Sequence, residues 1–366
     1  MYNPIGKIMS NELFIFHVIA GLISSFIIVW ISVPSIVRVS KNKHLFDEPD
    51  ERSSHVSEVP ILGGLAIFAG FIISVNLWIS PQLFPSFQYI VAAVIIIFFI
   101  GIKDDILIIA PFTKFVGQFI AALVIVVLGD IRITSLHGFF GIEEINYYWS
   151  IIITIFTIVT IINGFNFIDG IDGLSASIGI ISSGAFGYWF FSVQEYQYAI
   201  ISAALIGALF AFFLYNVFGE ENKIFMGDTG SLIIGLVLSV LVIYFNELNI
   251  DKGKTFSIYP APAVSFGVLI IPLFDTMRVV FIRIFKGHAL MKPDKNHLHH
   301  QLLELGLSHI QVTMIISVVN VFFIYLVFNL ASFISIRRLL LIILVLAMLL
   351  SYIPPFILNK RKKSNK

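Results

Sequence analysis

Residues 148–193 have the sequence YWSIIITIFTIVTIINGFNFIDGIDGLSASIGIISSGAFGYWFFSV, in which two apolar stretches enclose a short polar loop. The stretches cover about 148–162 and 173–193, and neither contains a charged residue. Apolar stretches of roughly 20 residues are typical of membrane-spanning helices. The loop carries Asp169 and Asp172, and acids at the edge of a bilayer usually mark a functional site.

The rest of the chain has the same character. Of its 366 residues 58% are hydrophobic and 12% charged, and the mean hydropathy is +0.96. This composition predicts an all-α integral membrane protein. We expect a polytopic bundle of about 11 transmembrane helices, forming a single transmembrane catalytic domain over 1–366, with the first span retained because no small-x-small cleavage pattern follows it. The apolar stretches cover about 13–37, 61–80, 88–102, 112–129, 148–162, 173–193, 198–218, 230–246, 262–282, 310–333 and 338–358.

The net charge of +1 hides a sided distribution of lysine and arginine. With eleven spans, the odd-numbered loops lie on the same side as the C-terminus, and this side holds 17 of the 23 basic residues. The positive-inside rule then predicts a cytoplasmic C-terminus and an N-terminus outside. The basic tail, 360–366, is interpreted as a cytoplasmic anchor that contacts lipid headgroups. We expect no nucleic-acid partner.

Asp104 and Asp105 close the third predicted span in the motif GIKDD. Two adjacent carboxylates do not both ionise cheaply without a cation. Acids also oppose the dipole at the C-terminus of a helix, which argues against a merely solvated helix end. We interpret one as a general base or nucleophile and the other as a holder of substrate or metal. Lys114 begins the next span close to them; taken alone, it is equally a snorkelling residue.

The motif NGFNFIDGIDG places Asn163, Asn166 and Asp169 on one face of a helix, with Asp172 just beyond. Glycines in such a segment allow the backbone to approach a ligand closely. The alternative is that these side chains only form Asx turns and cap the next helix. Four polar side chains exceed what capping requires, so we interpret them as contacts to a substrate or cation.

The motif FMGDTGS places Asp228 between two glycines at the start of the eighth span. The N-terminus of a helix offers free N–H groups and a positive dipole, which suit a phosphate. Magnesium takes few protein carboxylates and leaves its other positions to water and substrate phosphates. Asp228 is therefore the expected direct ligand of Mg²⁺, and Asn166 is a further candidate. All five aspartates fall on the predicted cytoplasmic side.

Two further loops on that side carry histidines and basic residues. KPDKNHLHHQLLELG contains His297, His299 and His300, for which contacts to a pyrophosphate or sugar are the favoured interpretation. A zinc site is the alternative, but HxHH lacks the HExxH spacing and the chain has no cysteine. A solvated basic loop is the third interpretation. In DEPDERSSHVSEVPILGG, Arg52 and His55 are candidate phosphate contacts.

A cation-coupled transporter is the competing class of function, because intramembrane acids also line ion pathways. In transporters such acids lie near the bilayer midplane on broken helices. Here they are predicted at the ends of spans, beside glycine-rich loops, which favours an enzyme.

Together these motifs resemble the polyprenyl-phosphate N-acetylhexosamine-1-phosphate transferases, from about Asp47 to Gly306 and in the family's order. The form HLHHQLLELG is more similar to the GlcNAc branch than to the MurNAc-pentapeptide branch. The resemblance implies transfer of a sugar 1-phosphate, with GlcNAc favoured, from a UDP-N-acetylhexosamine to undecaprenyl phosphate, releasing UMP. That reaction is the first membrane step of cell-envelope polysaccharides such as O-antigen. UDP-MurNAc-pentapeptide and other UDP-N-acetylhexosamines are the alternative donors.

The resemblance also implies residue roles, cofactors and a location. It makes Asp228 a ligand of Mg²⁺, with Mn²⁺ as a substitute, and places Asp104 and Asp105 at the lipid phosphate. It places Phe225 against the uracil. It further implies a bacterial cytoplasmic membrane with the active site on the cytoplasmic face, and leaves a homodimer open. The nucleotide pocket would include Asp169 and Asp172, and His297 would be needed for activity.

Overall fold

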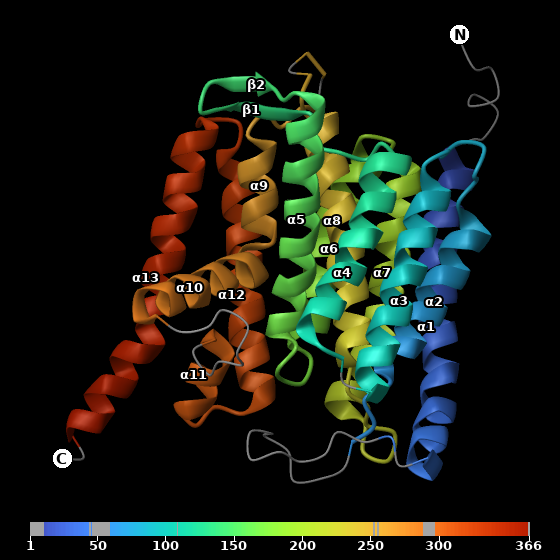
Figure 1. Cartoon of the computed structure of the whole chain (residues 1–366), viewed down its shortest axis with the longest axis vertical. Helices are drawn as coiled ribbons and strands as arrows, with labels where there is room; N and C mark the ends of the chain where they lie inside the picture. The colour runs from blue at the N-terminus through green and yellow to red at the C-terminus, as the bar shows by residue number, and fades with distance from the viewer. Residues whose placement is uncertain are drawn as a thin grey trace.

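The computed structural model describes residues 11–43, 45, 59–107, 109–251, 253–254, 256–287 and 297–364. Its helices lie side by side in one bundle (Figure 1). The elements are α1 (Asn11–Lys43), α2 (Gly63–Trp78), α3 (Phe87–Leu107), α4 (Pro111–Leu123) with the π-helical turn η2 (Val124–Leu128), β1 (Ser135–Phe139), β2 (Ile142–Glu144), α5 (Tyr147–Ile168), α6 (Leu174–Ser192), α7 (Tyr196–Phe218), α8 (Gly227–Leu248), α9 (Ala261–Val268), α10 (Ile270–Lys286), α11 (Leu298–Glu304), α12 (His309–Leu330) and α13 (Ile336–Ser364).

Within the described residues, eight helices are long and apolar enough to cross a membrane. They are α1, α4 with η2, α5, α6, α7, α8, α12 and α13. The all-α membrane fold is therefore confirmed, whereas the count of about eleven spans stays a prediction. Sequences as rich in isoleucine as α5 become helical because a bilayer requires every backbone polar group to be bonded within its own segment.

The two ends of the bundle differ. The β1–β2 hairpin lies at the end where α1 begins, and α11 lies at the opposite end, where α13 also terminates (Figure 1). The acidic ends of α3 and α5 and the start of α8 share the α11 end (Figure 1). We call this the acidic end, and the prediction that it faces the cytoplasm rests on the charge distribution.

The ninth predicted span, 262–282, is not one continuous helix, and this expectation was wrong. The chain forms α9, breaks at Leu269, and continues as α10, which runs across the bundle (Figure 1). Pro272 explains the break, because proline has no N–H to donate to the carbonyl four residues earlier. That carbonyl, of Val268, instead accepts a hydrogen bond from Ser182 Oγ at 3.3 Å.

The β1–β2 hairpin was not predicted. It is short, and Ser135 pairs with Glu144 and Phe139 with Ile142. Gly138 and Gly141 have positive φ angles of 72° and 80°, which glycine adopts without steric cost. The spacing of these glycines in HGFFG is the turn signal present in the sequence.

The first turn of α8 packs so closely against α2 and α3 that backbone atoms of these helices are in contact. A Cβ added to Gly64 of α2 would lie 2.3 Å from Gly230 N, and one on Gly101 of α3 would lie 2.4 Å from Thr229 Cα. Close packing of this kind needs small residues at the helix interface. It fixes the position of Asp228, in the first turn of α8, relative to α3.

Candidate active site at the acidic end of the bundle

Asp105 caps the N-terminus of α8 from a neighbouring helix. Its Oδ1 accepts a hydrogen bond from Asp228 N at 2.6 Å. Its Oδ2 accepts hydrogen bonds from Thr229 Oγ1 at 2.5 Å and Thr229 N at 3.2 Å. The first N–H groups of a helix have no partner within the helix, and a carboxylate also complements the dipole there. Asp105 therefore holds α8 in register with α3.

Asp228 and Lys114 form the centre of the site. The Asp228 carboxylate contacts the Lys114 ammonium and accepts a hydrogen bond from Asn166 Nδ2 at 2.6 Å. The same ammonium donates to Asn166 Oδ1 at 3.1 Å and lies 3.3 Å from Asp104 Oδ2. Helices α3, α4, α5 and α8 thus each place one polar side chain around a single point.

A second polar pair lies one helical turn farther along α4 and α5. Asn163 Nδ2 donates to Gln118 Oε1 at 2.7 Å, and Gln118 Nε2 donates to Asn163 Oδ1 at 3.3 Å. Lys114 and Gln118 occupy one face of α4, and Asn166 and Asn163 the facing side of α5. The prediction that Lys114 lies close to the Asp104–Asp105 pair is confirmed by its contact with Asp104. Asn163 is here a hydrogen-bond partner of Gln118.

Asp169 differs from the other acids, because its carboxylate has no hydrogen bond or ion pair within the described part of the chain. Desolvation raises the pKa of this half-buried carboxyl well above its usual range, and the negative charges of Asp228, Asp105 and Asp172 raise it further. A carboxylate with neighbouring charges but no partner is available to an incoming cation or donor group.

Asp172 lies on the other side of the same loop and is strongly held. Its Oδ2 lies 2.7 Å from Lys223 Nζ and 3.3 Å from His309 Nδ1. The Lys223 ammonium is also 5.9 Å from the centre of the Phe225 ring. Phe225 N donates to Pro60 O at 2.8 Å, which ties the FMGDTGS loop to the chain entering α2. Asp172 and Phe225, both predicted for the nucleotide pocket, are therefore brought together through Lys223.

A buried aspartate that the sequence analysis missed orients His297. Asp275, on α10 and 2% exposed, lies with Oδ2 2.8 Å from His297 Nδ1. Its Oδ1 accepts hydrogen bonds from Arg278 Nη2 at 2.9 Å and Leu298 N at 3.1 Å. The signal was available, since Asp275 is the only acid within the apolar stretch 262–282. Such intramembrane acids are functional candidates by default.

The histidines of α11 reach the loop that carries Asp169. The rings of His297 and His299 stack with their centroids 5.7 Å apart, and the ring centroids of His299 and His300 are 4.2 Å apart. His299 Nε2 faces Gly170, where an added Cβ would be only 2.6 Å away. Burial lowers the pKa of His299 to about 3, with a smaller contribution from His300, so this imidazole is neutral at physiological pH.

Two predicted contacts, Arg52 and His55, lie outside the described residues. Their role as phosphate contacts therefore stays a prediction from the sequence. The structure therefore brings together Asp104, Asp105, Lys114, Asn166, Asp169 and Asp228 at the start of α8, and Asp275, His297, His299 and His300 beside the Asp169 loop.

The donor atoms at Asp228 are those that magnesium prefers. Two carboxylates and an amide oxygen surround the Lys114 ammonium, so these groups already accommodate a positive charge. Within the described ranges, no three histidine or acidic side chains are arranged as a closed metal cage. Mg²⁺ does not need one, because it commonly uses one or two carboxylates plus water and phosphate oxygens. The residues therefore fit Mg²⁺, with Asp228 and Asn166 as ligands.

These features define an integral membrane protein with a cluster of carboxyl, amide and ammonium groups at one end of its helical bundle. Residues 87–246 match the model of a protein family described as Glycosyl transferase family 4. The matched segment runs from α3 to α8 and contains all five aspartates predicted for the site.

The chain is also similar to named bacterial proteins. It is 29% identical over 304 residues to the undecaprenyl-phosphate alpha-N-acetylglucosaminyl 1-phosphate transferase of Salmonella typhimurium, covering 82% of this chain and 80% of the relative. It is 28% identical over 299 residues to the protein of that name from Escherichia coli K12, covering 81% and 79%. The decaprenyl-phosphate N-acetylglucosaminephosphotransferase of Mycobacterium tuberculosis H37Rv is 32% identical in an alignment of 292 residues, which covers 73% of this chain and 71% of the relative. The chain belongs to glycosyl transferase family 4, as its motifs indicated.

Proposed function

We propose that this protein transfers GlcNAc 1-phosphate from UDP-GlcNAc to a polyprenyl phosphate, with undecaprenyl phosphate as the bacterial acceptor, and releases UMP. The names of relatives that align with about four-fifths of the chain support this substrate pair. We further propose that the reaction requires Mg²⁺ and takes place on the cytoplasmic face of the bacterial inner membrane.

One observation carries the proposal. The side chains of Asp104, Asp228 and Asn166 converge on one cationic point, and the unpartnered Asp169 carboxylate lies close to them. The cluster lies at the ends of helices, not at their middles (Figure 1). A lipid phosphate held in the membrane and a water-soluble nucleotide sugar would meet at such an interface, whereas a transport pathway would place its acids near the midplane.

In the proposed reaction an oxygen of the lipid phosphate attacks the β-phosphorus of UDP-GlcNAc, and the bond from that phosphorus to the bridging oxygen breaks. Such transfers depend on positioning and on stabilising charge. A bound Mg²⁺ would supply Lewis-acid stabilisation of the departing phosphate. Lys114 contributes a fixed positive charge beside Asp104, where the lipid phosphate would approach. Asp105 keeps Asp228 aimed into the site by holding the first turn of α8.

A two-step route through an aspartyl-phosphate is the alternative mechanism. The contacts make Asp105 a poor nucleophile, because its two oxygens already accept three hydrogen bonds. Asp104 is the better candidate: Ile109 N donates to its Oδ1 at 2.8 Å, and its Oδ2 faces Lys114. Incubation with UDP-GlcNAc and no lipid would trap a labelled enzyme only if the two-step route operates.

The direct test uses purified full-length protein with undecaprenyl phosphate, Mg²⁺ and UDP-GlcNAc. We expect UMP release that requires the lipid, yields a lipid-linked sugar phosphate and stops when EDTA removes the metal. If UDP-GlcNAc is inactive, UDP-GalNAc and UDP-MurNAc-pentapeptide are tested next. Folded protein that releases no UMP from any of these donors would overturn the proposal.

A further inference from the structure

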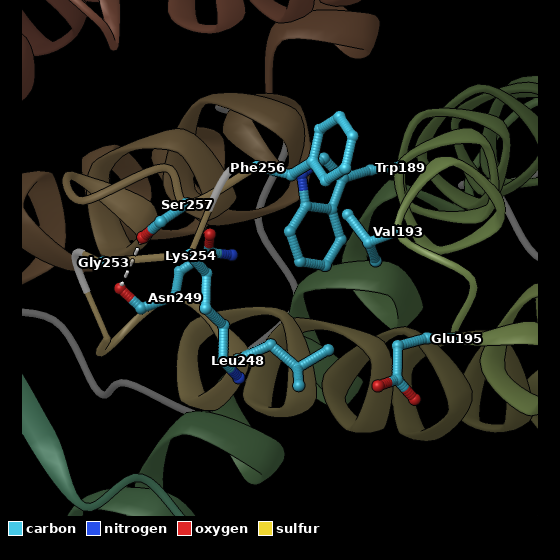
Figure 2. A pocket seen from close by; sticks show the side chains of 9 residues that line it. All are labelled: Trp189, Val193, Glu195, Leu248, Asn249, Gly253, Lys254, Phe256 and Ser257. Atoms are coloured by element: carbon cyan, nitrogen blue, oxygen red, sulfur yellow. Dashed lines mark hydrogen bonds between the residues drawn. The ribbon is translucent and has the colours of Figure 1, made fainter.

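A cavity of about 340 Å³ lies at the end of the bundle opposite the acidic end. It is bounded by the ends of α6 and α8, the start of α7 and the loop joining α8 to α9. Its wall includes Trp189, Glu195, Leu248, Asn249, Lys254 and Phe256 (Figure 2). None of these residues belongs to the proposed transferase site, which lies at the far end of α8.

The acidic wall of the cavity is held by an aromatic pair. Tyr244 Oη donates to Glu195 Oε2 at 3.1 Å. The Tyr244 ring stacks on Tyr198 with centroids 3.6 Å apart and an angle of 11° between the planes. Glu195 itself occupies the turn between α6 and α7, where its carbonyl accepts hydrogen bonds from Tyr198 N and Ala199 N, both at 3.2 Å. The Glu195 side chain, which lines the cavity, is therefore held in position.

The basic wall is held by the fully buried Asn249. Asn249 Nδ2 donates to Phe245 O at 2.7 Å, and its Oδ1 accepts from Ile258 N at 2.6 Å, which closes the α8–α9 loop. Within this loop, Ser257 N donates to Lys254 O at 3.0 Å. The backbone at Lys254 is thus held by hydrogen bonds within the loop.

Glu195 and Lys254 do not pair with each other within the described residues, although both line the same cavity. They come from either side of Leu248, and the rings of Trp189 and Phe256 form the adjoining wall (Figure 2). A carboxylate beside an aromatic face suits an ammonium group, and a lysine suits a phosphate. A ligand that satisfies both walls carries an ammonium group and a phosphate group.

We propose that this cavity binds a phosphoethanolamine group, with its ammonium on Glu195 and its phosphate on Lys254. The position at the ends of three helices, with Trp189 in the wall, matches the headgroup level of the leaflet opposite the acidic end. An aminophospholipid and a soluble phosphoethanolamine compound share this chemistry. The inference does not depend on the transferase proposal, because it concerns binding at the other end of the molecule.

The test measures binding to the detergent-purified full-length protein by native mass spectrometry and by the shift in unfolding temperature. The probes are dihexanoyl phosphatidylethanolamine, dihexanoyl phosphatidylglycerol and O-phosphoethanolamine. We expect saturable binding of the phosphatidylethanolamine. Glu195→Gln and Lys254→Gln should each weaken it by about tenfold, as expected when one charged hydrogen-bond partner is removed.

Matched controls are Glu144→Gln on β2 and Arg338→Gln on α13, which change one charge each and do not line the cavity. Both should bind the probe like the unaltered protein. Binding of O-phosphoethanolamine alone would identify a soluble ligand, whereas binding that requires the acyl chains would identify the lipid. Equal binding of phosphatidylglycerol, or unchanged affinity in both cavity variants, would overturn the proposal even if UMP release is normal.

Discussion

The acid cluster around Asp228 and the histidine cluster of α11 lie at the same end of the bundle but are built on opposite principles. The acid cluster contains four carboxyl groups and one lysine, so acidic groups outnumber basic ones and a further cation would favour their ionised forms. The histidine cluster is oriented by one buried acid, Asp275, and contains an imidazole that burial keeps neutral. The first arrangement suits binding a metal and the second suits fixing hydrogen-bond geometry. Variants of each cluster should therefore fail in different ways.

The largest effect is expected for Asp228→Asn. Loss of this carboxylate removes the proposed metal ligand, and UMP release should fall by about a thousandfold or more, corresponding to roughly 4 kcal/mol of barrier. The thermal unfolding temperature should stay close to that of the unaltered protein, because Asp105 still holds α8. Asp130→Asn, which changes an exposed acid at the opposite end of the bundle, is the matched control. Near-normal turnover at saturating Mg²⁺ would remove Asp228 from the metal site.

Lys114→Met tests whether the lysine offsets the charge of the acid cluster. Without the ammonium, Asp104 and Asp228 face each other without compensation, and activity should fall by about a hundredfold. Added Mg²⁺ should then raise the unfolding temperature of the variant more than that of the unaltered protein, since the metal replaces the lost charge. An identical Mg²⁺ effect in both proteins would contradict this account of the cluster.

Asp275→Asn tests the histidine cluster. The variant keeps the volume of the side chain but removes the charge that orients His297, and activity should fall roughly tenfold to a hundredfold. The Mg²⁺ concentration giving half-maximal activity should remain unchanged, which separates this variant from Lys114→Met. A positioning role also predicts a shifted pH profile and partial recovery in Asp275→Glu. An altered Mg²⁺ requirement would show that the acid cluster and the histidine cluster act together in metal binding.

The smallest effect concerns His299 and acidity. Its pKa is lowered to about 3 in the folded protein, so below the ordinary histidine pKa the unfolded chain binds a proton that the folded chain does not. Stability from this residue is therefore complete at neutral pH and is lost as pH falls, by at most about 1.4 kcal/mol per pH unit below roughly 6.5. Unfolding temperatures at pH 7 and pH 5 should differ less in His299→Gln than in the unaltered protein. His300→Gln provides the comparison.

The sequence was sufficient to predict an all-α membrane protein and the convergence of the acidic motifs. Spans follow from long apolar stretches, and acids at span ends on one side of a bundle have little choice but to lie near one another. The partners of each acid did not follow. Asp104 and Asp105 are adjacent in sequence, yet one faces Lys114 and the other caps α8, because successive residues of a helix point in different directions.

Two features escaped prediction for related reasons. The stretch 262–282 is apolar enough for a span, so its hydropathy predicted one continuous helix. Pro272, which disfavours a continuous helix, indicated the break that the structure shows. Because the stretch was predicted as a single apolar span, Asp275 was not predicted as a site residue, although it is the only acid there. The contact of His299 with Gly170 joins segments far apart in sequence, and no local pattern indicates it.

The capping of α8 by Asp105 also bears on how the protein is made. The two partners are separated by 123 residues, so the ribosome completes α3, α4, α5, α6 and α7 before α8 exists. Until then the Asp104–Asp105 pair in the membrane has no helix N-terminus to hold. Assembly of the site is therefore a late event in biosynthesis, and chains that stop before Gly227 would leave the Asp105 carboxylate without the N–H groups that it caps.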